Sequence, residues 1–179
     1  VSENSNTKVL LIEAGGKDSY PWLHIPVGYY KTMHNPKTDW CYKTEPDKTM
    51  VNRSIPYPRG KTLGGSSSIN GLLYIRGQEQ DYDIWRQLGN KGWGWKDIFP
   101  YFLKSENQER GKSKFHNVGG PLSVSDTRIK LDLLEKFMNA AEDNGIPIVD
   151  DFNTVTNFGF GYFPVTDKNR LSFSASVGY

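Results

Sequence analysis

The feature that most constrains the fold is a continuous apolar run near the start of the chain. Residues 8–13 read KVLLIE, and Ala14, Gly15 and Gly16 follow directly. Strands that are covered on both faces of a parallel sheet lose the alternation of polar and apolar residues. The run therefore predicts a buried parallel strand, and together with the helical segments below it indicates the α/β class (α+β overall).

Glu13 lies at the predicted carboxyl end of this strand. In dinucleotide-binding folds an acid at that position accepts hydrogen bonds from the adenosine ribose; a solvated strand-end acid is an equally good interpretation of the segment alone. The Gly-rich phosphate loop of such folds lies about 20 residues before the acid. Only twelve residues precede Glu13. We therefore expect the first strand and its loop to be missing, and residues 1–6 to be the tail of the following helix.

A second constraint is the stretch at residues 58–77, PRGKTLGGSSSINGLLYIRG. Gly64 and Gly65 let backbone amides approach a ligand, and the serines that follow favour the cap of a helix over residues 66–73. Amides at a helix N-terminus attract anions, so a pyrophosphate could bind there beside Arg59 or Lys61. The alternative is a flexible Gly-Ser turn. The apolar residues that follow directly argue against a plain linker.

The rest of the chain divides by its periodicity. Residues 20–47 are rich in aromatic residues and prolines, and we expect an ordered excursion that covers a ligand, with a short helix near residues 27–33 and a strand near 40–44. Apolar residues at helical spacing predict further helices, and alternation predicts one strand. The helices are expected at residues 81–88, 96–106 and 129–144, the strand at 122–125, and an exposed boundary loop at 108–117.

Metal and acid–base chemistry find little support in the sequence. The histidines are His24, His34 and His116, and none has neighbours at metal-ligand spacing, so structural roles are favoured and no metal site is predicted. The pair Asp150 and Asp151 also lacks a third ligand at a suitable spacing, and we interpret it as a solvated turn.

Composition excludes several classes of function. The formal net charge is +2, which is too small to argue for nucleic acid as a partner. No run of 18 apolar residues predicts a membrane span, and the first residues are too polar for a secretory signal. A single cysteine, Cys41, fits a reducing compartment and favours the cytoplasm. Because the chain opens at Val1 instead of methionine, we expect it to be cut from a longer one.

These residues together resemble the glucose-methanol-choline (GMC) family of flavin-dependent alcohol oxidoreductases, in its choline-dehydrogenase-like branch. The most specific match is the family's first signature at residues 58–71, continuing to Gly77. Supporting matches are VLLIEAGG at residues 9–16, the segment from Asp81 to Trp93, and Pro100-Tyr101-Phe102 with Glu106.

The resemblance implies a partial FAD-binding domain of dinucleotide type at residues 1–118, including the flavin-covering excursion, and the start of an antiparallel-sheet substrate domain at residues 119–179. It implies that FAD accepts a hydride from an alcohol, and that electrons pass to oxygen or a quinone-type acceptor. The family's catalytic histidine lies near the carboxyl terminus, and nothing here matches its motif. We therefore assign no catalytic residue and expect the isolated chain to be inactive.

The resemblance also implies the residues that contact the cofactor. Glu13 corresponds to the ribose ligand, and members with covalently bound flavin carry a histidine where this chain has Ile69, so FAD is expected to bind non-covalently. The residues implied along the pyrophosphate and the flavin are Arg59, Leu63, Gly64, Gly65, Ser66, Asn70, Gly71 and Leu72. A catalytically incomplete segment with residual nucleotide or anion binding remains the alternative.

Overall fold

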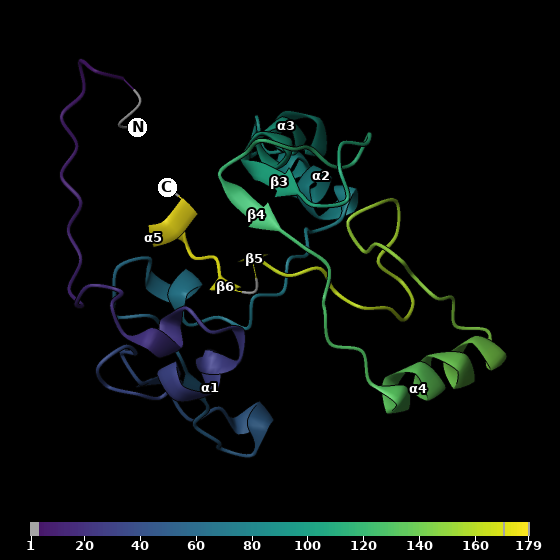
Figure 1. Cartoon of the computed structure of the whole chain (residues 1–179), viewed down its shortest axis with the longest axis horizontal. Coiled ribbons are helices and arrows are strands. Elements are labelled where there is room, and N and C mark those ends of the chain that lie inside the picture. Colours follow the sequence, from purple (N-terminus) through teal and green to yellow (C-terminus); the bar gives the residue numbers. More distant parts are fainter. Residues whose placement is uncertain (1–3, 170, 179) are drawn as a thin grey trace. The chain divides into compact units, whose positions relative to one another are not determined.

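A computed structural model describes residues 4–169 and 171–178 (Figure 1). The chain divides into two compact units, Val1–Gly71 and Leu72–Tyr179. The domain division expected between residues 118 and 119 stays a prediction. None of the helices in the described ranges is long and apolar enough to cross a membrane.

The first unit is built from short helices and turns. Prolines open two 3-10 turns, η1 (Pro21–Leu23) and η2 (Pro26–Gly28), because their fixed φ suits the first helical position. Helix α1 (Tyr29–Thr32) follows, and β1 (Tyr42–Lys43) pairs antiparallel with β2 (Pro56–Tyr57). The expected helix near residues 27–33 and strand near 40–44 are confirmed. A 3-10 turn, η3 (Lys48–Met50), lies between the two strands.

The prediction of a buried strand at residues 8–13 is wrong for this structure. The segment is extended, as Figure 1 shows, but it forms no strand with any described residue. Leu10, Leu11 and Ile12 are 82%, 76% and 82% exposed. A parallel strand needs a neighbour to satisfy its backbone groups and helices to cover its faces. Residues 4–6 form a turn closed by the bond from Thr7 N–H to the Asn4 carbonyl, and residues 1–3 lie outside the described ranges.

The helix predicted over residues 66–73 is also wrong. The serines form a single 3-10 turn, η4 (Gly65–Ser68), which ends at Ile69. Beyond it the chain is not helical: Leu72 has a positive φ of 67°, and the backbone of Leu73 forms a β-bridge with Val165. Non-helical partners therefore take the backbone groups that a helix would have used.

The second unit contains the longer helices, α2 (Glu79–Gln87), α3 (Trp95–Ser105) and α4 (Asp132–Asp143), which confirm the three predicted helices. Asp81 and Asp97 accept hydrogen bonds from the backbone N–H groups that begin α2 and α3. Pro100 lies inside α3. Aromatic rings from the two helices pack together, with Tyr82 stacked on Trp95 at 5.6 Å between ring centroids.

Short strands complete the second unit. β3 (Glu106–Gln108) pairs parallel with β4 (Leu122–Val124), and Glu106 lies opposite Leu122. The pair lies beside α2 and α3 in Figure 1. β5 (Asp167–Lys168) pairs antiparallel with β6 (Leu171–Ser172), and α5 (Ala175–Gly178) follows. Residues 109–115 form no helix or strand, but Gln108 and His116 are buried, so the predicted exposed loop is shorter than expected.

Candidate functional site

In the first unit, the two motifs that sequence analysis singled out come together. Gly16 forms a parallel β-bridge with Thr62, and its carbonyl accepts hydrogen bonds from Leu63 N–H at 3.0 Å and Thr62 Oγ1 at 3.1 Å. Gly15 packs so closely that a Cβ on it would lie 2.0 Å from the Lys61 carbonyl oxygen. The end of the segment that contains Glu13 is therefore fixed against the residues just before Gly64.

Glu13 itself is exposed, and its Oε1 accepts a hydrogen bond from Gly15 N–H at 2.7 Å. This bond holds the carboxylate close to the junction with Thr62. A carboxylate has acceptor sites beyond the one used here, so it can still accept hydrogen bonds from ligand hydroxyl groups.

The loop around Gly64 is closed by contacts that only small residues allow. A Cβ on Gly60 would lie 2.1 Å from the Gly65 carbonyl oxygen, and Gly60 N–H donates to Ser66 Oγ at 3.1 Å. The hydroxyl groups of Ser67 and Ser68 donate back to the carbonyls of Gly64 and Leu63, at 2.6 Å and 2.9 Å. These hydrogen bonds and close contacts fix the conformation of the loop.

Arg59 is placed by a buried acid that sequence analysis missed. Asp39 is 1% exposed, and its carboxylate accepts N–H bonds from Arg59 at 2.8 Å, Cys41 at 2.9 Å and His34 at 2.7 Å. Burial alone would raise the pKa of Asp39, but the three N–H donors outweigh it and lower this pKa. The Arg59 guanidinium is exposed and lies over the Tyr57 ring, 3.9 Å from its centroid. Nothing in the local sequence pattern signals this role of Asp39.

The loop has two features that suit a phosphate-bearing ligand: hydrogen-bond donors and an open side. Gly64 and Gly65 have positive φ values of 86° and 56°, and a Cβ on Gly65 would meet no described atom within 4 Å. Ser66 is exposed and accepts the bond from Gly60, so its own hydroxyl proton is not used in that contact. η4 is too short to provide the helix N-terminus that the sequence suggested, and an exposed cation, Arg59, precedes the loop in the chain.

The remaining predicted residues lie on either side of the boundary along the chain between Gly71 and Leu72. Asn70 and Gly71 are exposed and end the first unit, and a Cβ on Gly71 would meet no described atom within 4 Å. Leu72 begins the second unit and is buried. Glu13, Arg59 and residues 63–66 thus lie within one unit, and their contacts with a cofactor stay a prediction.

The second unit contains a buried network of charged side chains. Glu106 is 0% exposed and forms an ion pair with Arg76 at 2.9 Å. Its other oxygen is 2.9 Å from His116 Nδ1, and His116 Nε2 is 2.6 Å from Asp151 Oδ2. Asp151 is therefore not the solvated residue that the sequence suggested. Residues 35 positions apart meet here, which no local spacing could reveal.

The electrostatics of this network fix the charge of His116. Burial by itself would lower the pKa of His116, but the bonds to Asp151 and Glu106 outweigh burial and raise it to about 9. Burial alone would raise the pKa of Asp151, but the hydrogen bonds from His116 and from Asn153 N–H outweigh burial and lower this pKa. His116 is therefore a protonated structural residue. In the described part of the chain, no group of three or more potential metal ligands comes together.

Comparisons with known proteins assign the family. The family model described as GMC oxidoreductase matches residues 10–177. The chain belongs to the GMC oxidoreductase family. Membership agrees with the convergence of residues 13–16 on the loop at residues 60–66, since both belong to the motifs that carry the resemblance.

Individual GMC relatives are similar over the whole chain. An "Alcohol dehydrogenase [acceptor]" from Pseudomonas putida is 40% identical over 100% of this chain and 33% of its own length. An "Oxygen-dependent choline dehydrogenase" from Sinorhizobium fredii is 37% identical, again over 100% of this chain and 33% of its own. The chain thus spans about a third of the length of these relatives.

Solved structures show the same architecture. Pyridoxine 4-oxidase from Mesorbium loti matches with a TM-score of 0.92 at 27% identity, over 99% of this chain and 35% of that one. An FAD-dependent oxidoreductase from Chaetomium thermophilum matches with a TM-score of 0.86 at 28% identity, over 99% of this chain and 33% of that one. The expected fold class, α/β (α+β overall) with a partial FAD-binding domain of GMC type, is confirmed.

Proposed function

We propose that this chain is part of an FAD-dependent oxidoreductase that acts on the CH–OH group of an alcohol. The observation that carries the proposal is the packing of Gly15 and Gly16, just after Glu13, against the residues that lead into Gly64. This brings a ribose-binding type of acid and a phosphate-binding type of loop into one unit. The names of the relatives, an alcohol dehydrogenase and a choline dehydrogenase, support the substrate class.

FAD would be held by residues whose chemistry matches its parts. Glu13 would accept hydrogen bonds from the ribose hydroxyl groups, and Arg59 with the Ser66 hydroxyl would face the pyrophosphate. Leu63, Gly64 and Gly65 would line the cofactor where no Cβ intrudes. Small residues matter because the ligand must approach the backbone closely.

The flavin end of the site would lie at Asn70, Gly71 and Leu72. Ile69, which precedes Asn70, is an aliphatic residue that is 3% exposed and carries no nucleophile for a covalent link. We therefore propose non-covalent binding. When bound, the flavin would supply the hydride acceptor for alcohol oxidation.

None of the three histidines suits the role of the base that removes the alcohol proton. His116 is held protonated between two carboxylates, so it has no free nitrogen to accept a proton. His24 and His34 lie in segments that do not match the family's catalytic motif near the carboxyl terminus. We propose that the base lies elsewhere in the full-length protein. We also propose that the electron acceptor is oxygen or a quinone-type compound, and that the protein is cytoplasmic, as Cys41 favours.

The test is to purify the full-length protein encoded by the gene and record its visible spectrum. We expect flavin absorbance that is released into the supernatant by acid precipitation, and bleaching of that absorbance by a primary alcohol under anaerobic conditions. A folded protein that takes up no FAD would refute the proposal. Flavin that stays with the precipitate would refute non-covalent binding alone.

A second candidate applies to the 179-residue chain by itself: a catalytically incomplete segment with residual nucleotide or anion binding. The exposed apolar run at residues 10–12 favours it, since these side chains require a cover that the described residues do not provide. Titrating the isolated chain with FAD separates the cases. Tight binding with alcohol turnover would contradict the second candidate, and we expect neither.

A further inference from the structure

We infer that Asn153 is a positioning residue for the flavin: its side chain fixes residues 72–76, the segment that continues from the proposed flavin-facing residues. The inference rests on the proposed function, because Leu72 is one of the residues assigned to the flavin above. Asn153 belongs to a closed ring of hydrogen bonds between buried side chains, and it connects this ring to the backbone of residues 72–76.

The Asn153 amide bonds to the backbone in two places. Its Oδ1 accepts a hydrogen bond from Arg76 N–H at 2.7 Å, and its Nδ2 donates to the Tyr74 carbonyl at 3.1 Å. The first of these contacts is buried, and Asn153 is 4% exposed. The Asn153 side chain thus bonds to one backbone N–H and one backbone carbonyl of the segment, as a neighbouring strand would. These two bonds fix the backbone there.

The same segment is held on the other side by residues 164–166. Tyr74 N–H donates to the Pro164 carbonyl at 2.9 Å, and the Leu72 carbonyl accepts from Thr166 N–H at 2.8 Å and Thr166 Oγ1 at 3.3 Å. Leu72 has a φ of 67°, a conformation that is unfavourable for a leucine and persists only where its surroundings enforce it. These contacts supply that enforcement.

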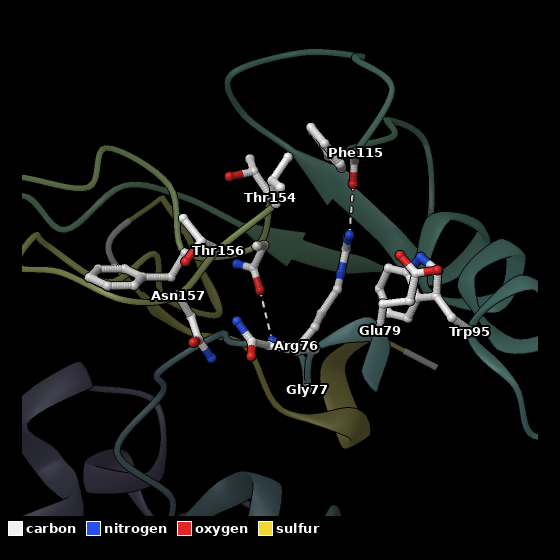
Figure 2. A pocket seen from close by; sticks show the side chains of 12 residues that line it. Arg76, Gly77, Glu79, Trp95, Phe115, Thr154, Thr156 and Asn157 are labelled. Carbon is white, nitrogen blue, oxygen red and sulfur yellow. Dashed lines mark hydrogen bonds between the residues drawn. The ribbon is translucent and has the colours of Figure 1, made fainter. Parts of the chain in front are cut away.

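The charged network makes the position of Asn153 rigid. Asp151 Oδ1 accepts from Asn153 N–H at 2.8 Å, and the other Asp151 oxygen contacts His116. From His116 the ring continues through Glu106 to the Arg76 side chain. The Arg76 guanidinium also donates to the Phe115 carbonyl at 2.7 Å, and Figure 2 marks this bond and the backbone bond of Arg76 as dashed lines. Arg76 thus closes the ring, since its backbone and side chain are both held.

A cavity of about 120 Å³ lies beside this ring, and Figure 2 shows Thr154, Thr156 and Asn157 on its wall. Asn157 provides a matched control, because it is an asparagine of the same loop that is exposed and four residues from Asn153. It has no part in the ring. Replacing it removes an amide of the same size without touching residues 72–76.

The test uses the full-length protein with FAD and compares Asn153→Ala with Asn157→Ala. For Asn153→Ala we expect the dissociation constant for FAD to rise about tenfold, since two hydrogen bonds are lost. We also expect a displaced visible absorption band and an altered flavin midpoint potential, which a loss of stability alone would not produce. Asn157→Ala should match the parent protein in all three measurements.

The outcomes separate this inference from the proposed function. If the parent protein binds no FAD, the proposed function fails first. If the parent binds FAD and folded Asn153→Ala has the same affinity, band position and potential, the inference is wrong. If Asn153→Ala does not fold, Asn153→Asp decides: it keeps an oxygen that can accept from Arg76 N–H and removes the Nδ2 donor to the Tyr74 carbonyl. A displaced band in that variant supports the inference, and an unchanged one overturns it.

Discussion

The imidazole of His116 lies between two carboxylates, with Nε2 2.6 Å from Asp151 Oδ2 and Nδ1 2.9 Å from Glu106 Oε1. Both nitrogens donate only when the ring is protonated, and the charge is then balanced on both sides. Arg76 pairs with the remaining oxygen of Glu106, and Arg110 contributes a further positive charge near Asp151. The second unit is thus joined at its centre by alternating charges, and its stability should depend on the proton carried by His116.

We expect stability to fall as pH rises through the folded-state pKa of His116. This pKa is raised from 6.5 to about 9, so the stabilisation is fully present below pH 6.5 and is lost as the pH passes 9. The loss should be on the order of 2 kcal/mol. Thermal unfolding midpoints between about pH 6 and pH 10 measure it. His116→Gln should remove this dependence. His24→Gln is the control and should keep it, because the His24 ring contacts a backbone carbonyl.

Glu106→Gln should be strongly destabilising. The substitution keeps the shape of the side chain but leaves Arg76 and His116 buried without their anionic partner. Breaking a buried pair from one side costs about 3–5 kcal/mol. Glu109→Gln is the control, because Glu109 is an exposed residue that pairs with Arg128 and should cost less than about 1 kcal/mol. Urea unfolding measures both, and equal losses would contradict the prediction.

Two adjacent glycines allow a sharp test of the loop junction. Gly15→Ala would place a Cβ 2.0 Å from the Lys61 carbonyl oxygen, and the backbone would have to move apart. We expect a loss of about 1–3 kcal/mol or more, with weaker FAD binding in the full-length protein. Gly16→Ala should be tolerated, since its Cβ would meet no described atom within 4 Å. Similar effects of the two substitutions would show that the junction is not packed as described.

Asp39→Asn should loosen the backbone around Arg59. The amide that replaces the carboxylate can offer one oxygen to the three N–H donors, and charge-assisted bonds are about twice as strong as neutral ones. Because the pKa of Asp39 is lowered, its stabilisation is present above about pH 3.9 and is lost as pH falls through the folded value. Acid unfolding should therefore begin at a lower pH in the parent protein than in Asp39→Asn. The control is Asp47→Asn, because the Asp47 carboxylate is exposed and its loss should change the acid profile less. Identical acid profiles would argue against the role of Asp39.

Much of the local structure follows from the sequence because its causes are local. The apolar period of residues 132–143 and the acids Asp81 and Asp97 near the starts of α2 and α3 place helices where they are observed. The glycines at 60, 64 and 65 indicate a tight loop, since their small size and free φ are properties of single residues. The order of these motifs also identifies the family.

Tertiary structure decided what depends on distant partners. The run at residues 8–13 has the composition of a buried strand, but pairing requires a neighbour that no described segment supplies. Residues 66–73 have helical apolar spacing, yet Thr166 and Pro164 bond to the backbone groups of Leu72 and Tyr74 and keep them out of a helix. The meeting of His116 with Asp151, and of Asp39 with Arg59, depends on chain paths that spacing does not encode. The sequence alone determined the loop chemistry and the family; the packing of remote residues decided how that loop is held.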